Sequence, residues 1–179
     1  MAQLVIAKYN EDISWIKPLA QKHEIIIYDK SGQKNGFIDL ENVGRESHTF
    51  LYHIINNYRN LADYTVFLQG DPLAHWDRFD HFDANEYKPL GTWYRCDKTG
   101  LPHHAGLPLE YLYEALKTHD NPMPDLIEFY AGAQYVVPKQ NILHYPIQFY
   151  QKAYEMHYSL DVMPWAIERF WDLIWTNKL

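Results

Sequence analysis

Cysteine is almost absent from this sequence of 179 residues. The single cysteine, Cys96, cannot form a disulfide within the chain. A chain of this length can bury about two-thirds of its unfolded surface, so it needs no disulfide or metal to fold. The first residues also reach a charge too early for a signal peptide. We therefore expect a cytoplasmic protein.

Positive charge and long apolar runs are scarce as well. The chain has 16 Lys and Arg against 23 Asp and Glu, a net charge of -7 at pH 7. This balance removes the diffuse attraction that most binders of nucleic acid or anionic membranes use, so we expect no nucleic-acid partner. No apolar run approaches the roughly 18 residues that cross a bilayer, so we expect no membrane span. The GxSxG motif and the glycine-rich phosphate loops of P-loop and dinucleotide-binding enzymes are missing too.

Aromatic residues and histidines, in contrast, are abundant. The chain has 6 Trp, 15 Tyr, 8 Phe and 10 His. Aromatic side chains offer apolar faces with polar edges, which suit sugar rings and nucleotide bases. For any single aromatic residue, packing in the core remains the favoured interpretation.

The apolar pattern predicts one α/β domain over residues 1–179, with a mostly parallel sheet flanked by helices. Residues 72–108 show little periodicity, and we expect an extended functional loop region there. The predicted strands are 4–9, 24–28, 64–68, 91–96 and 129–137, and the predicted helices are 13–23, 46–58, 109–118, 147–158 and 164–175.

Polar residues follow each of the first three predicted strands. In an open α/β sheet the ligand lies beyond the carboxyl ends of the strands, so these residues are candidates for a binding site. The alternative is that Asn, Asp and Gly simply form the turns. The candidates are Tyr9, Asn10 and Glu11 after the first strand, Asp29 and Lys30 after the second, and Gln69, Gly70 and Asp71 after the third.

Asp71, in the segment FLQGDP, is the strongest candidate for a metal ligand. A carboxylate at a strand end can ligate Mn²⁺ or Mg²⁺, which in turn can hold a diphosphate. The same Asp-Pro pair also fits an ordinary turn. A metal site of mixed imidazole and carboxylate ligands is a further alternative, because His and Asp are dense in this region. They are Asp71, His75, Asp77, Asp80, His81 and Asp83.

The segment Gly44 to His48 lies at the start of a predicted helix. Free backbone N–H groups and the helix dipole favour an anion there, and Arg45 adds a bidentate donor for phosphate. We expect His48 to contact the same ligand. The alternative is a helix cap in which Ser47 or Glu46 serves the first turn.

Glu168 lies in the apolar and aromatic segment PWAIERFW. Such surroundings can raise the pKa of a carboxyl group and make it a general base. The carboxylate could equally form a structural ion pair with Arg169 or Arg45, and the sequence leaves this choice open.

Six segments, in order, resemble a known family: LVIAKYNEDISWI, IIIYDKSG, NVGRESHTFLYHIINNY, DYTVFLQGDP, FYAGAQYVVPKQNI and PWAIERFWDLIW. The family is poorly characterised and is catalogued as a domain of unknown function related to glycosyltransferases. The likeness covers nearly the whole chain. It implies the glycosyltransferase A fold, an α/β topology that binds nucleotide sugars.

The resemblance also implies roles for particular residues. Residues 9–11 would hold the nucleotide base, and Glu168 matches the region that supplies the catalytic base in inverting members. Residues 69–71 stand where many such enzymes have Asp-any-Asp for a manganese or magnesium ion. Gln69 departs from that pattern, which argues against strong metal dependence.

A glycosyltransferase is therefore the leading functional hypothesis, with a nucleotide-sugar donor and a glycan or other hydroxyl acceptor. Because the chain is short for that fold, we expect its acceptor-binding part to be minimal or to come from a partner, either another subunit or a second copy of the chain. The alternatives are a non-catalytic module that binds carbohydrate or nucleotide, and a metal-dependent hydrolase that uses residues 71–83.

Overall fold

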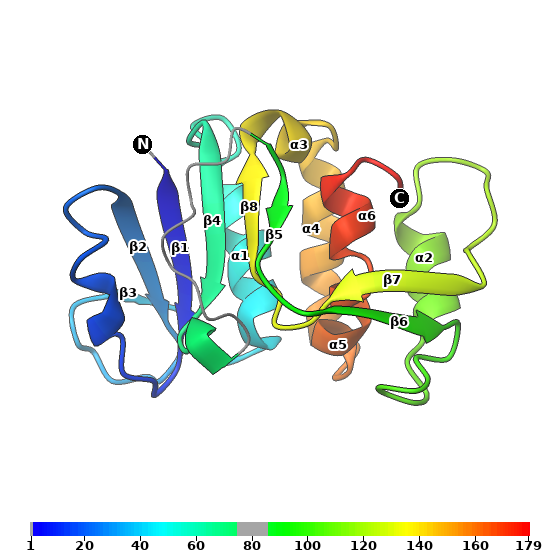
Figure 1. Ribbon diagram of the computed structural model, residues 1–179, viewed down its shortest axis with the longest axis horizontal. Helices are drawn as coiled ribbons and strands as arrows, with labels where there is room; N and C mark the ends of the chain where they lie inside the picture. The colour runs from blue at the N-terminus through cyan, green and yellow to red at the C-terminus, as the bar shows by residue number, and fades with distance from the viewer. Residues whose placement is uncertain (1, 75–85) are drawn as a thin grey trace.

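The computed structural model describes residues 2–74 and 86–179, which form a mixed α/β fold (Figure 1). The strands are β1 (Gln3–Lys8), β2 (Glu24–Asp29), β3 (Ile38–Asp39), β4 (Tyr64–Gln69), β5 (Lys88–Pro89), β6 (Trp93–Asp97), β7 (Leu126–Tyr130) and β8 (Tyr135–Pro138). The α-helices are α1 (Arg45–Asn57), α2 (Leu109–Leu116), α3 (Lys139–Leu143), α4 (Ile147–Glu155), α5 (Met163–Glu168) and α6 (Trp171–Trp175). Three short 3-10 helices are η1 (Ser14–Ile16), η2 (Pro72–Ala74) and η3 (Met156–Tyr158).

Six strands form one sheet in the order β3-β2-β1-β4-β8-β5. The strands β1 to β4 run parallel, and β8 is antiparallel to both of its neighbours, β4 and β5. The predicted α/β class and the mostly parallel sheet with helices are thus confirmed. From β1 the chain moves outward to β2 and β3, then returns to place β4 on the other side of β1. This reversal leaves a crevice between the carboxyl ends of β1 and β4, where ligands bind in open α/β sheets.

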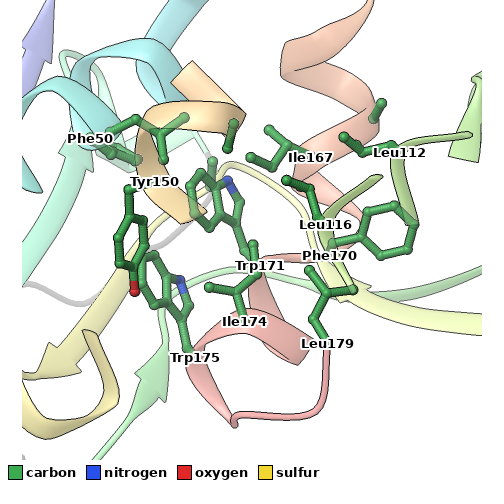
Figure 2. Packing of buried hydrophobic residues seen from close by; sticks show 14 of the residues in the cluster. Phe50, Leu112, Leu116, Tyr150, Ile167, Phe170, Trp171, Ile174, Trp175 and Leu179 are labelled. Atoms are coloured by element: carbon green, nitrogen blue, oxygen red, sulfur yellow. The ribbon is translucent and has the colours of Figure 1, made fainter. Parts of the chain in front are cut away.

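The central strands β1 and β4 are buried on both faces, as their apolar runs predict, whereas the edge strand β3 is exposed. In β1, Val5 and Ala7 pack into the larger core, whereas Leu4 and Ile6 pack into a smaller cluster on the opposite face. The larger core lies between the sheet and the helices, of which Figure 1 shows α1 behind the sheet and α4, α5 and α6 to its right. Its centre is a stack of Trp171 and Trp175, whose ring centroids lie 4.9 Å apart with nearly parallel planes (Figure 2).

The predicted helix over 13–23 is wrong: only the single turn η1 forms, followed by irregular turns. Pro18 has no N–H, so it cannot donate the bond to Ser14 that an α-helix would need at this point. Instead Lys17 donates to the Ser14 carbonyl and Leu19 to the Ile16 carbonyl, which is the tighter 3-10 spacing. Ile13, Trp15 and Leu19 still reach the smaller core cluster.

The predicted strand over 129–137 is also wrong, because it is two strands in two sheets. β7 pairs with β6 in a separate two-stranded antiparallel sheet, and β8 enters the main sheet. The break comes at Gly132 and Ala133, whose φ angles of 93° and 47° are positive, and two such residues in succession interrupt a regular strand. Ala133 is a non-glycine residue there, which indicates that its surroundings hold the turn in place.

The other predicted elements form with small shifts in their ends. The predicted helix over 164–175 is interrupted after α5, where Arg169 and Phe170 donate hydrogen bonds to carbonyls only three residues back. Four short elements, β3, η2, β5 and α3, were not predicted. In the part of the chain that the structure describes, no helix is long and apolar enough to span a membrane.

Candidate functional site

A cavity of about 250 Å³ lies at the carboxyl ends of β1 and β4. Ala7 pairs directly with Gln69, so the two strands end side by side. The ends of these strands, the residue after β2 and the start of α1 together form its wall. Its lining residues are Ala7, Lys8, Tyr9, Glu11, Lys30, Asn42, Arg45, Glu46, Gln69 and Gly70.

Tyr9, Glu11, Lys30, Arg45 and Gln69, all predicted from the sequence, line this cavity. Asn10 and Asp71 lie at the same edge of the sheet, each two residues beyond the end of β1 or β4. Both are exposed, and neither lines the cavity.

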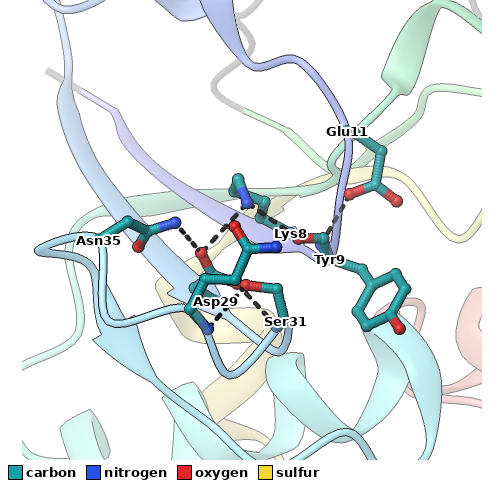
Figure 3. Close-up of polar contacts among 7 residues, drawn as sticks. Lys8, Tyr9, Glu11, Asp29, Ser31 and Asn35 are labelled. Carbon is teal, nitrogen blue, oxygen red and sulfur yellow. Dashed lines mark hydrogen bonds and ion pairs between the residues drawn. The ribbon is translucent and has the colours of Figure 1, made fainter.

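Asp29 supports the cavity wall from behind. It is 1% exposed, and its carboxylate pairs with Lys8 at 3.1 Å, while Ser31 and Asn35 donate hydrogen bonds to it (Figure 3). Burial alone would raise the pKa of Asp29, but the hydrogen bonds from Ser31, Asn35 and Lys8 together lower it to about 2. Figure 3 shows the ring of Tyr9 turned away from this network. Asp29 therefore orders Lys8 instead of facing the ligand.

We predict that Asp29→Asn lowers the free energy of unfolding by about 3 kcal/mol, because the buried Lys8 loses its counter-charge. The folded-state pKa lies below the unfolded one, so this stabilisation is present above about pH 4 and is lost as the pH falls toward 2. Denaturant unfolding at neutral pH measures it. The control is Asp39→Asn, at the exposed partner position on β3. Equal stability of the two variants would contradict the prediction.

Lys30 holds the turn that leads into α1. Its ammonium group donates hydrogen bonds to the carbonyls of Val43 and Arg45, on either side of Gly44. Gly44 and Arg45 have φ angles of 63° and 50°, both left-handed. A Cβ atom at Gly44 would lie 2.3 Å from the His157 ring, so only glycine fits. Burial lowers the pKa of Lys30 to about 8, against the opposing charges of Glu46 and Glu41.

This turn places Arg45 at the mouth of the cavity. The Arg45 side chain is 58% exposed, and its guanidinium lies 5.6 Å from the centre of the Trp165 ring on α5. The geometry leaves its N–H groups available to an anion.

Glu46 is a cavity residue that the sequence analysis treated only as a helix cap. Its side chain is 14% exposed, and one carboxylate oxygen lies 3.6 Å from the Arg45 Nε. Burial raises the pKa of Glu46, and the nearby charge of Glu168 raises it further, whereas Arg45 and Lys30 oppose this shift. The only signal in the sequence was a carboxylate directly after Arg45 at a helix start.

Gln69 carries a donor that has no partner among the described residues. Its Nε2 is buried and makes no hydrogen bond to any described residue, although the side chain lines the cavity. A buried polar group without a partner costs about 1–3 kcal/mol, so a ligand oxygen that accepts this bond would bind favourably.

His48 does not reach the cavity. It is fully buried between α1 and α4, with its ring stacked on Tyr154 at 4.4 Å and its Nε2 3.1 Å from the Tyr158 hydroxyl. His48 therefore does not line the cavity, because its side chain faces the helix packing.

Glu168 lies at the end of α5, beside the turn that precedes β8. One carboxylate oxygen accepts a hydrogen bond of 3.0 Å from the Gly132 N–H, and the other pairs with Arg169. Of the two ion pairs that the sequence left open, the structure contains the one with Arg169. Glu168 does not line the cavity, although its charge acts on Glu46.

Of the predicted metal ligands, Asp71 is the one that lies within the described residues. Among the described residues, no group of three or more His, Cys, Asp or Glu side chains is arranged to hold a metal ion. The remaining predicted ligands, His75, Asp77, Asp80, His81 and Asp83, lie outside the described residues. A role of Asp71 in binding Mn²⁺ or Mg²⁺ stays a prediction.

Residues 4–93 match the model of a family described as "Protein of unknown function (DUF3431)". The match covers half of the 179 residues. This chain belongs to the DUF3431 family. Every residue that lines the cavity of this DUF3431 chain lies within the matched segment, whereas α5 with Glu168 lies beyond it. No curated protein and no solved structure matches the chain.

Proposed function

We propose that this protein is a glycosyltransferase with a glycosyltransferase A-like fold, which binds a nucleotide sugar at the cavity and transfers the sugar to a hydroxyl group. The acceptor is a glycan or another hydroxyl compound. The observation that carries the proposal is the place of the cavity, at the reversal of strand order between β1 and β4, together with its cationic and amide donors.

The donors suit a diphosphate. Lys30 and Arg45 bring positive charge to the cavity, whereas Lys8 is paired with Asp29, and Gln69 adds an amide N–H that has no partner among the described residues. Arg45 can bind two phosphate oxygens at once, since its guanidinium is planar and largely exposed. Glu11 and Glu46 also line the cavity, so its positive charge is confined to the side of Lys30 and Arg45.

The size of the cavity fits part of a nucleotide sugar. Pockets that enclose drug-sized ligands measure about 300–1,000 Å³, and this one is about 250 Å³. We therefore expect it to enclose the diphosphate and one ring, with the rest of the ligand on the surface. Tyr9 lines the cavity with 46% exposure, which leaves its ring available for stacking on a base.

A non-catalytic module that binds the same ligands is the second candidate. Gln69 favours it, because a neutral amide stands at the strand end where a metal-dependent transferase would carry a carboxylate. The two candidates differ in turnover: both bind a nucleoside diphosphate, but only the enzyme releases it from a nucleotide sugar.

We predict that a nucleoside diphosphate stabilises the protein against heat. A ligand at about 100 times its Kd contributes about 2.7 kcal/mol. Thermal shift with UDP, GDP and ADP, with and without Mn²⁺, measures this effect. Arg45→Ala should remove most of the shift, whereas Arg59→Ala, at an exposed arginine outside the cavity, should retain it. A shift that survives Arg45→Ala unchanged, or no shift with any of the three, would refute this assignment of the site.

A further inference from the structure

We propose that Glu46 is the general base of this site, the group that takes the proton from the acceptor hydroxyl. The inference rests on the proposed function and adds to it the residue that moves the proton. It is carried by the position of Glu46 in the cavity wall and by the free acceptor capacity of its carboxylate.

Glu46 is the second residue of α1 and lines the cavity together with Lys30 and Arg45. Its carboxylate accepts a hydrogen bond from its own backbone N–H. The Arg45 Nε at 3.6 Å is beyond hydrogen-bond distance. An ionised carboxylate has about four lone-pair positions, so Glu46 retains acceptor capacity for a bound hydroxyl.

Two other carboxylates near the cavity, Glu168 and Glu11, are less suitably placed. Glu168 uses one oxygen for the Gly132 N–H and the other for Arg169, and it does not line the cavity. Glu11 lines the cavity, but its Oε2 accepts a short hydrogen bond of 2.6 Å from the Tyr9 backbone N–H. Glu46 differs from Glu11 in lying beside Arg45 and Lys30, whose charges act on it, so it is the carboxylate nearest to the proposed diphosphate position.

The surroundings of Glu46 also suit a base. Burial raises the pKa of its carboxyl group, and so does the charge of Glu168 on α5. The opposing positive charges are Arg45 on α1 and Lys30 after β2, which keep the carboxylate from becoming neutral too readily. A base is most effective when its pKa lies near the working pH, so a raised carboxyl pKa favours proton transfer.

Sugar transfer breaks two bonds and forms two. The acceptor O–H bond breaks and its proton moves to the Glu46 carboxylate. The acceptor oxygen forms a bond to the anomeric carbon of the sugar as the bond between that carbon and the diphosphate oxygen breaks. The electron pair of the broken bond leaves with the nucleoside diphosphate, which Arg45 and Lys30 stabilise by charge.

Glu46→Gln tests the proposal, because glutamine has nearly the same shape and cannot take up the proton. Release of nucleoside diphosphate from a panel of UDP- and GDP-sugars should fall by about a hundred- to ten-thousand-fold in kcat. Donor affinity should change little, and Glu46→Asp, which keeps a carboxylate, should retain more turnover than Glu46→Gln. The matched control is Glu114→Gln on the exposed side of α2.

The pH profile separates a base from a structural residue. Wild-type kcat should fall with decreasing pH as Glu46 becomes protonated, and that acidic limb should be absent in Glu46→Gln. If the wild type turns over and Glu46→Gln stays within about threefold of it with the same pH profile, Glu46 is not the base and the proposed function still stands. If the wild type releases no nucleoside diphosphate from any donor, both the function and the base are wrong.

Discussion

Acidification from about pH 7 to about pH 4 is expected to destabilise this protein by several kcal/mol, because three buried histidines must stay neutral in the folded state. Burial lowers the pKa of His48 to about 3 and the pKa of both His53 and His157 to about 4. An unperturbed histidine has a pKa near 6.5.

The contacts of these histidine rings show why burial lowers their pKa values so strongly. His53 Nδ1 lies 3.0 Å from the Tyr28 hydroxyl. His157 lies 2.8 Å from the Ser47 hydroxyl through Nε2 and 3.0 Å from the Ala153 carbonyl through Nδ1. These partners are uncharged, so none of them compensates a buried imidazolium.

Nearby charges also affect the pKa of His48 and His157, whereas burial alone lowers the pKa of His53. The Lys30 ammonium further disfavours the protonated form of both His48 and His157. Glu41 is the nearest carboxylate to His48, at 3.8 Å, but its side chain is 52% exposed. Solvent therefore screens the attraction, and burial remains the dominant cause.

The sign of the effect follows from linkage. Because the folded-state pKa values lie below the unfolded ones, the unfolded chain binds more protons once the pH falls below about 6.5. The stabilisation is complete above that pH and is lost progressively as the pH falls toward the folded-state values. Each unit of difference in pKa corresponds to about 1.36 kcal/mol, and domains have only about 5–15 kcal/mol of stability in total.

Melting temperatures between about pH 7.5 and pH 4 measure this loss. His53→Gln should reduce the dependence of unfolding free energy on pH by up to one proton, even if it also lowers stability at neutral pH. His144→Gln, at an exposed histidine, should leave the slope unchanged. A melting temperature that stays constant over this range would contradict the prediction.

The sequence predicted the location of the cavity better than its chemistry. The short apolar runs of β1 and β4 are easy to identify, and parallel neighbouring strands necessarily end at one edge. Residues 9–11 and 69–71 therefore come together whatever the details of their turns. The direction in which a side chain points could not be predicted in the same way. Lys30 turns toward two backbone carbonyls, and this depends on a left-handed turn at Gly44 and Arg45 that no periodicity indicates.

The fold escaped prediction where two elements share one apolar pattern. Strands β7 and β8 are both partly apolar and only four residues separate them, so residues 129–137 read as one strand. The left-handed turn at Gly132 and Ala133 separates them, and the contact that holds it comes from Glu168, 36 residues away. A contact at that distance is set by tertiary packing and is invisible in a local window.

That same contact makes Glu168 the centre of the second large effect. We predict that Glu168→Gln lowers the free energy of unfolding by about 3–5 kcal/mol, because Arg169 is buried and loses its carboxylate partner. The Arg169 guanidinium also lies 3.9 Å from the centre of the Phe129 ring, which fixes it inside the core. At about 2–4 °C per kcal/mol for a chain of this size, the melting temperature should fall by about 10 °C.

A double variant separates the ion pair from a catalytic role. Glu168→Gln combined with Arg169→Met removes both charges and keeps an apolar chain over Phe129, so it should recover much of the lost stability. Glu155→Gln, at an exposed glutamate at the end of α4, is the control and should melt within about 1 °C of the wild type. If Glu168→Gln melts like the wild type while turnover falls by about a hundredfold or more, Glu168 acts as the base that the sequence suggested. If the melting temperature falls and the double variant restores it, the Glu168 carboxylate serves to neutralise Arg169 and to hold the turn before β8. Removing the charge of Arg169 could restore stability in this way, but it could not restore the function of a catalytic base.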